Sequence, residues 1–354
     1  MLFRRTRGPA EEAWQLLLVR AAAGGPSAIV VKAHHALGDS YALIAELSGL
    51  FDGQDPRPRT AKLGSPKPVG SGDPGRDGSR RRARVGAALR VARSLAALSL
   101  AGPPGPIGVD GGVSPATSRR EFAAISLDAR MVAVKARTLG AGTVDLVLGV
   151  AASAIGQLMA GGGQPAAAAT VRAMVPCSLR SAGSSGRPAA WRAAVGRGAS
   201  SGGAGNRTAG VLLDLPVGPM SLAERVTAVR TVRRARLRRG DAEASAFVLR
   251  AMNLLPAPLQ RVIARTAFTS RRFSLIVSVF PGTRQSRRLL GAQVTEVFPV
   301  LALADGVGLA LGAMTWGRSL SIGIMADPAL VPEVGYLAAA IRDAFAAVDV
   351  GSAG

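Results

Sequence analysis

Strand-like and helix-like segments are mixed along this chain of 354 residues without strict alternation. Apolar runs bounded by Gly, Pro and polar residues predict strands at 12–19, 27–33, 119–127, 168–180, 208–217, 273–280, 291–300, 309–316 and 319–326. Helical spacing of apolar residues predicts helices at 128–140, 143–159, 221–238, 256–270 and 331–347, and one after the second strand. Such a mixture favours an α+β fold over a doubly wound sheet.

The chain is strongly basic. Its formal net charge is +22, almost wholly from arginine, and its pI is near 11.7. This charge suggests an anionic partner: nucleic acid, an acidic membrane surface or a phosphorylated cofactor. Only 4% of the residues are aromatic, which leaves little material for stacking on bases. We therefore expect no nucleic acid among the partners.

Cysteine and histidine are scarce. The lone Cys177 excludes an intramolecular disulfide and a cysteine metal cluster, and the two histidines are adjacent, which makes a poor zinc site. We expect no bound metal and a reducing cytoplasm. Cys177 ends a predicted strand, where a cysteine usually packs in the core, and a role as a nucleophile is the alternative.

No segment has the features of a secretion signal or reaches the roughly 18 uncharged apolar residues of a membrane span. We expect a soluble or peripheral protein. The predicted basic helix at 79–100 mixes apolar residues with arginines, among them Arg80, Arg81, Arg82 and Arg84. It is either a solvated helix packed on its own protein or a segment that lies on an anionic membrane surface.

The two histidines, His34 and His35, follow the predicted strand at 27–33, and Asp39 comes four residues after His35. Asp39 or Ser40 then caps the predicted helix. The pair therefore lies on a strand-to-helix corner. A histidine beside a cavity can take a proton from a hydroxyl group that attacks an activated acyl group, while a nearby carboxylate fixes the loop. From the spacing alone, two ordinary turn histidines are an equal alternative.

The stretch "HHALGDS" resembles the HHxxxDG motif of acyltransferases of the chloramphenicol-acetyltransferase-like fold. Further stretches resemble one group of them, the bacterial wax ester synthase/diacylglycerol acyltransferase family. They occur in the expected order from about Glu11 onward: "EAWQLLLV", "TVDLVLGVAASAI", "MVPCSLR", "GNRTAGVLLDLPVG" with "ERVTAVR", "FSLIVSVFPGTR", "GAQVTEVFPV", "LADGVGLALGAMTW" and "LSIGIMADPALVPE".

The resemblance implies two chloramphenicol-acetyltransferase-like domains with mixed sheets, and a tunnel between them that admits acyl-CoA and a lipid alcohol. It implies that His35 is the general base, that His34 and Asp39 organise the corner, and that acyl-CoA is a co-substrate with no bound cofactor. Asn206 and Arg207 of "GNR", and Asp305 and Gly306 of "LADGVG", are expected near the tunnel or the domain interface.

The chain departs from the family pattern at its N-terminal side. Ser40 replaces the final Gly of the motif, and only 33 residues precede His34, where the family has a longer segment. We expect an incomplete N-terminal domain at 1–100, with a linker at 52–78 and the basic helix at 79–100. A second linker at 101–118 and a C-terminal domain at 119–350 follow.

The sequence thus predicts an acyl-CoA-dependent O-acyltransferase that forms triacylglycerol or wax ester from diacylglycerol or a long-chain alcohol. We expect it in the cytoplasm, peripheral to the inner face of the membrane or on a lipid-droplet surface. One alternative is a catalytically impaired or inactive paralogue that binds lipid or protein. A nucleic-acid-binding protein is the other, and it would bind DNA with a steep salt dependence and have no affinity for acyl-CoA.

Overall fold

The computed structural model describes residues 14–21, 25–33, 43–44, 47, 49–52, 107, 117–162, 170–178, 208–252, 255–256, 258–260, 262 and 269–348. The chain forms two compact units. The smaller comprises residues 1–69, 180–208 and 287–294, and the larger comprises residues 70–179, 209–286 and 295–354.

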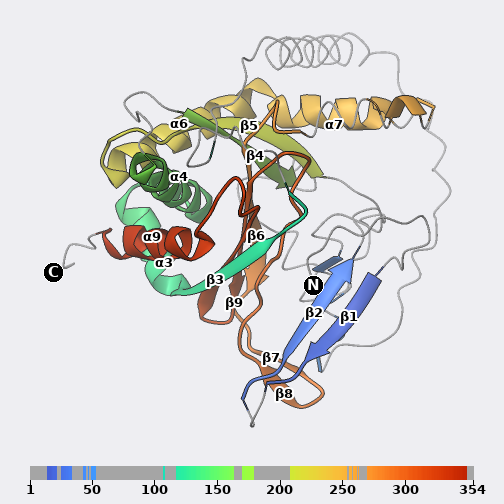
Figure 1. Ribbon diagram of the computed structural model, residues 1–354. Coiled ribbons are helices and arrows are strands. Elements are labelled where there is room, and N and C mark those ends of the chain that lie inside the picture. The colour runs from blue at the N-terminus through green and yellow to red at the C-terminus, as the bar shows by residue number, and fades with distance from the viewer. Residues whose placement is uncertain are drawn as a thin grey trace, which may run out of the picture. The chain divides into compact units, whose positions relative to one another are not determined.

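A six-stranded sheet of mixed direction is the centre of the larger unit (Figure 1). Its strands, in order across the sheet, are β3 (Glu121–Asp128), β10 (Ser319–Ala326), β9 (Leu309–Trp316), β6 (Leu275–Thr283), β4 (Thr170–Ser178) and β5 (Thr208–Pro216). β10 runs antiparallel to both β3 and β9, whereas β6 runs parallel to β9 and to β4. The α+β class with mixed sheets is therefore confirmed.

Helices pack on one face of this sheet, and Figure 1 shows α3, α4 and α9 gathered there. The helices of the larger unit are α3 (Ala129–Thr138), α4 (Thr143–Gly161), α6 (Leu222–Arg239), α7 (Asp241–Met252) and α9 (Val334–Ala346). α4 contacts α3, α6 and α9, so it forms the middle of the core. The side chains of Leu320, Ile322 and Ile324 on β10 belong to this core.

α4 is long and apolar enough to cross a membrane, with a mean hydropathy of 1.6, but 72% of its apolar window is buried inside the protein. Among the residues that the structure describes it is the only helix of this kind. Two of its glycines allow close packing. A Cβ at Gly149 would lie 2.6 Å from Val226 of α6, and one at Gly156 would lie 2.2 Å from the carbonyl oxygen of Val217. The apolar composition of α4 is thus explained by its place in the core.

The opposite face of the sheet is crossed by the chain around Pro299. Gly312 of β9 pairs with Gly323 of β10, and a Cβ at Gly323 would lie 2.2 Å from the Pro299 carbonyl oxygen. The two glycines therefore make room for a backbone segment. This explains why residues 291–300, predicted as one strand, form only β8 (Ala292–Val294): residues after 294 lie across the sheet instead of pairing along an edge.

Two hairpins are described in the smaller unit. β1 (Trp14–Val19) pairs antiparallel with β2 (Ala28–Ala33), with Trp14 opposite Ala33. β7 (Arg287–Leu289) pairs antiparallel with β8. Leu290 and Gly291 form the turn of this second hairpin with φ of 50° and 79°, so both central residues are left-handed, as in a type I′ turn.

The other predicted strands and most predicted helices are confirmed with small shifts at their ends. Two elements were missed: β7, and α7, which begins directly after the left-handed Gly240 that ends α6. In the predicted helix at 256–270, the structure has helical residues at 258–260 and 262, whereas Thr269 forms a parallel bridge with Asp305. The basic helix predicted at 79–100 lies outside the described residues.

Candidate functional site

The chain on both sides of the histidine pair has the predicted conformation. β2 ends at Ala33, the residue before His34, and Leu43, Ile44 and Leu47 are helical. His34, His35 and Asp39 themselves lie outside the described residues, as do Asn206 and Arg207, which directly precede β5. The roles of these five residues remain predictions.

Asp52 fixes the chain that follows the motif helix. Its carboxylate accepts hydrogen bonds from the backbone N–H groups of Leu290, at 2.9 Å, and Gly291, at 2.7 Å. The backbone N–H of Asp52 also donates to the carbonyl oxygen of Arg288, at 2.8 Å. Three bonds therefore join this point, 13 residues after the Asp39 of the motif, to the β7–β8 hairpin, two of them to its turn and one to β7.

Asp305 and Gly306 form a tight turn in the larger unit. The Asp305 carbonyl oxygen accepts a hydrogen bond from the Ser270 N–H at 3.1 Å, and Gly306 has φ of 71°. A Cβ at Gly306 would lie 2.5 Å from the Ser270 hydroxyl oxygen, so a glycine is needed here for two reasons. The turn is thus a structural link to residues 269–270, and a role in a tunnel remains a prediction.

Cys177 has the features of a packing residue. It lies half-buried in β4 against the core, and its thiol approaches the carbonyl oxygen of Val175 at 3.7 Å. Burial raises the pKa of the Cys177 thiol, so the thiol stays protonated at neutral pH. Because the thiolate is the reactive form, this environment disfavours a nucleophilic role.

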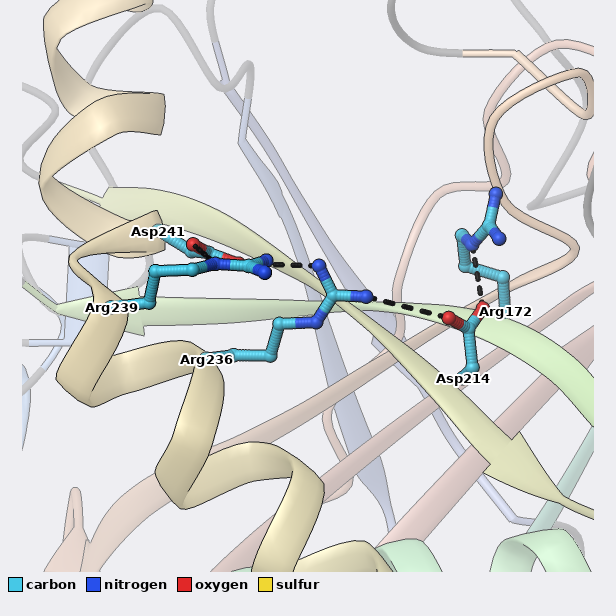
Figure 2. A network of polar contacts seen from close by, with 5 residues as sticks. All are labelled: Arg172, Asp214, Arg236, Arg239 and Asp241. Carbon is cyan, nitrogen blue, oxygen red and sulfur yellow. Dashed lines mark hydrogen bonds and ion pairs between the residues drawn. The ribbon is translucent and has the colours of Figure 1, made fainter. Parts of the chain in front are cut away.

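A chain of ion pairs that sequence reasoning did not predict joins two strands to the α6–α7 corner (Figure 2). The Arg172 Nε of β4 lies 2.7 Å from the Asp214 carboxylate of β5, and Arg236 of α6 reaches that carboxylate at 3.5 Å and Asp241 of α7 at 3.4 Å. Arg239 binds Asp241 through two contacts, at 2.8 and 2.7 Å. The hydrogen bond to Asp241 raises the pKa of Arg239.

This network is structural, because its members join successive elements and surround no described cavity. Its signal in the sequence is the arginine-rich end of α6, "RRARLRR", followed by Asp241. The pairing with Asp214 joins positions 22 residues apart, and the one between Arg172 and Asp214 joins positions 42 apart. Among the described residues, no three His, Cys, Asp or Glu side chains are placed to hold a metal ion.

Two further stretches quoted for the resemblance also have structural roles. In "ERVTAVR", the buried Arg225 donates to the carbonyl oxygens of Pro216 and, at 2.7 Å, Gly218. In "LSIGIMADP", the buried Asp327 accepts bonds from Thr117 at 2.6 and 2.7 Å and from Arg120 at 3.2 Å. Asp327 therefore ties the chain that enters β3 to the end of β10.

Known proteins with related sequences or folds include acyltransferases and peptide-synthetase domains. Residues 204–349 match the WS/DGAT C-terminal domain family. The chain is 24% identical over 345 residues to "Probable diacyglycerol O-acyltransferase tgs1" of Mycobacterium tuberculosis, which covers 94% of this chain and 70% of the relative. A relative from Mycobacterium bovis gives the same identity and coverage.

Solved structures share the fold. The wax ester synthase/diacylglycerol acyltransferase of Marinobacter aquaeolei VT8 superposes with a TM-score of 0.59 and 15% identity, covering 95% of this chain and 71% of the other. The epimerization domain of tyrocidine synthetase B gives a TM-score of 0.51 with 12% identity, covering 95% and 72%. The chloramphenicol-acetyltransferase-like fold expected from the sequence is therefore confirmed.

The order of the elements, the match of the C-terminal part and the relatives that align along nearly the whole chain agree with one another. Residues 204–349 belong to the WS/DGAT C-terminal domain family, and the chain as a whole is similar to diacylglycerol acyltransferases along nearly its full length.

Proposed function

We propose that this protein is an acyl-CoA-dependent O-acyltransferase that forms triacylglycerol or wax ester. The observation that carries the proposal is the family match at 204–349, together with diacylglycerol acyltransferase relatives that align over 94% of the chain. The acceptor is diacylglycerol or a long-chain alcohol, and acyl-CoA is the co-substrate.

His35 is the general base in this proposal. Its imidazole takes the proton of the acceptor hydroxyl while that oxygen attacks the carbonyl carbon of the thioester. The carbon–sulfur bond then breaks, the new ester leaves, and the departing CoA sulfur receives the proton from His35. This direct transfer of the acyl group requires no covalent acyl-enzyme, which agrees with the protonated, packed state of the Cys177 thiol.

The flanking structure supports a fixed corner for this chemistry. β2 holds the chain up to Ala33 in a hairpin with β1, and Asp52 holds the far end through the β7–β8 turn. A general base must stay within hydrogen-bonding reach of the hydroxyl, so anchors on both sides suit the role. His34 and Asp39 are proposed to organise the loop between these anchors.

The location and the domain division belong to the same proposal. We place the protein in the cytoplasm at an anionic membrane or lipid-droplet surface, with the basic segment 79–100 as the contact, because the substrates dissolve in lipid. The domains are proposed at 1–100 and 119–350, joined by residues 101–118.

A second candidate function is a lipid- or protein-binding paralogue without turnover. One feature of the sequence favours it: Ser40 stands where the motif that this stretch resembles ends in Gly.

The test is incubation of the purified full chain with radiolabelled palmitoyl-CoA and either diacylglycerol or hexadecanol, with product separation by thin-layer chromatography. Labelled triacylglycerol or wax ester supports the enzyme. Folded protein that gives neither product, yet still retains labelled lipid on a filter, supports the binding paralogue instead.

A further inference from the structure

An open groove with a volume of about 600 Å³ runs along α3 in the larger unit. Four arginines line it: Arg130 and Arg137 from α3, Arg284 from the chain after β6, and Arg318 from the β9–β10 turn. We call it the arginine groove. Its volume falls in the range of small-molecule sites.

Backbone hydrogen bonds fix the three segments that form the groove. The N–H of Ala129, the first residue of α3, donates to the carbonyl oxygen of Arg318 at 2.8 Å. The N–H of Gly317 donates to the carbonyl oxygen of Thr283, the last residue of β6, also at 2.8 Å. The arginine side chains are therefore carried by a framework that is already in place before a ligand binds.

Among the described residues, the positive charge of the four guanidinium groups is balanced only in part. All four arginines are exposed, and within the part of the chain that the structure describes none of their side chains makes a hydrogen bond or ion pair. Among the described residues that line the groove, the only acid is Asp128, which caps α3 by accepting bonds from the backbone N–H groups of Arg130 and Met131 at 2.8 and 2.9 Å. The groove thus keeps a clear excess of positive charge.

The arginines of the ion-pair network behave differently. Arg172, Arg236 and Arg239 each contact an aspartate (Figure 2). Four arginines that line one groove with a single acid beside them repel one another, and an anion between them reduces that repulsion. Planar guanidinium groups match the oxygens of a phosphate, which each can bind through two parallel hydrogen bonds.

We propose that the arginine groove binds the phosphate groups of an anionic ligand. The ligand also has an apolar part, because Met131 and Val134 line the groove between the arginines, and Met131 is 46% exposed. Two sources share this chemistry: coenzyme A, and the headgroup of an anionic phospholipid. Only the choice of these sources rests on the proposed function, since the charge and shape of the groove do not depend on turnover.

The experiment compares the full chain with Arg284→Gln/Arg318→Gln and with Arg234→Gln/Arg238→Gln. The second pair is the matched control, because Arg234 and Arg238 are exposed on α6, have the same charge and do not line the groove. None of these four side chains makes a hydrogen bond or ion pair with the described residues, so both variants should keep nearly the thermal midpoint of the wild type.

Binding of unacylated CoA is measured by calorimetry, and binding to vesicles of phosphatidylglycerol or of phosphatidylcholine by sedimentation. We expect the groove variant to bind one of the two anionic probes about tenfold more weakly than the control variant. A selective loss of CoA binding identifies CoA as the source, and a selective loss of binding to phosphatidylglycerol identifies the lipid headgroup. Equal binding by both variants to both probes overturns the proposal. Because binding is measured without turnover, a wild type that is silent in the acyl-transfer assay leaves this result intact.

Discussion

Asp145 of α4 and Arg233 of α6 form a bidentate ion pair. The arginine Nε lies 2.6 Å from the aspartate Oδ1, and its Nη2 lies 3.2 Å from Oδ2. The Asp145 carboxylate is buried, and it also accepts a hydrogen bond from the Gly142 N–H at the start of α4 at 3.2 Å. One carboxylate therefore caps the central helix and joins it to the arginine-rich helix across the core.

We predict that Asp145→Ala lowers the free energy of unfolding by about 3 kcal/mol, because it removes a cap and leaves a partly buried guanidinium without its partner. Urea unfolding followed by circular dichroism measures the change. Asp343→Ala, at an exposed position of α9, is the control and should cost less than about 0.5 kcal/mol. Equal losses for both variants would contradict the role given to the pair.

Substitution of Gly323 should be much less tolerated than substitution of another glycine. Gly323→Ala places a Cβ against the carbonyl oxygen of Pro299, so we expect a loss of about 2 kcal/mol or more as the segment over the sheet is displaced. Gly161→Ala is the matched control: it lies in the last turn of α4, and a Cβ there meets nothing within 4 Å. It should leave stability unchanged or raise it by up to about 1 kcal/mol. Thermal denaturation of both variants decides the matter.

The elements that the sequence predicted best are those whose pattern is local. β9 and β10 are continuous apolar runs separated by a short turn with Gly317, and their observed bounds equal the predicted ones. The segment after Val294 has a strand-like composition, which predicts a strand, but its position is decided by Gly312 and Gly323, which pair with each other and come later in the chain.

The candidate site shows the same limit. The strand and helix on either side of the histidine pair follow from local periodicity. The anchor at Asp52 does not, because its partner Leu290 is 238 residues away and is an apolar residue that is recognised through its backbone. The arginine groove is also assembled from three distant segments, and each of its arginines looks like an ordinary surface residue in the sequence.

The β7–β8 turn gives two predictions, one for the strained residue Leu290 and one for the Asp52 anchor. Leu290 is 92% exposed and has φ of 50°, which costs a side chain with a Cβ about 1 kcal/mol. We expect Leu290→Gly to preserve or slightly raise stability.

Asp52→Ala should remove both bonds from the turn, and the amide hydrogens of Leu290 and Gly291 should then exchange at least about tenfold faster. Unchanged exchange in folded Asp52→Ala would contradict the anchor.

Two helix caps predict how stability depends on pH. Hydrogen bonds from the Met131 and Arg130 N–H groups, with the charges of Arg318 and Arg130, hold the pKa of Asp128 below its ordinary value of 3.8. Hydrogen bonds from the Ser221 hydroxyl and N–H hold that of Glu224 below 4.5. A carboxyl group with a lowered folded pKa stabilises the protein above its unfolded pKa, and this contribution is lost as the pH falls through the folded pKa.

We therefore expect stability to fall below about pH 4.5, more steeply in the wild type than in Asp128→Asn/Glu224→Gln. The amides can still accept the capping hydrogen bonds, but they do not titrate. Urea midpoints measured from pH 6 to pH 3 provide the comparison. If the urea midpoints of the two proteins fell in parallel with pH, neither cap would contribute to the loss of stability in acid.

The two histidines should differ in what their removal does. His35→Ala should lower the rate of acyl transfer about 10²–10⁴-fold, as the loss of a general base does, while the thermal midpoint stays nearly unchanged. His34→Ala should mainly loosen the fold, so that its residual activity follows the amount of folded protein, and Asp39→Ala should resemble it.

The assay uses palmitoyl-CoA with hexadecanol or diacylglycerol, with the folded fraction measured by circular dichroism on the same samples. None of the three substitutions removes the bonds of Asp52 or the pairing of β2, so a selective loss of turnover in His35→Ala would report on chemistry and not on displacement of the corner. Full turnover by folded His35→Ala would refute the general-base assignment and leave the corner with a structural role only.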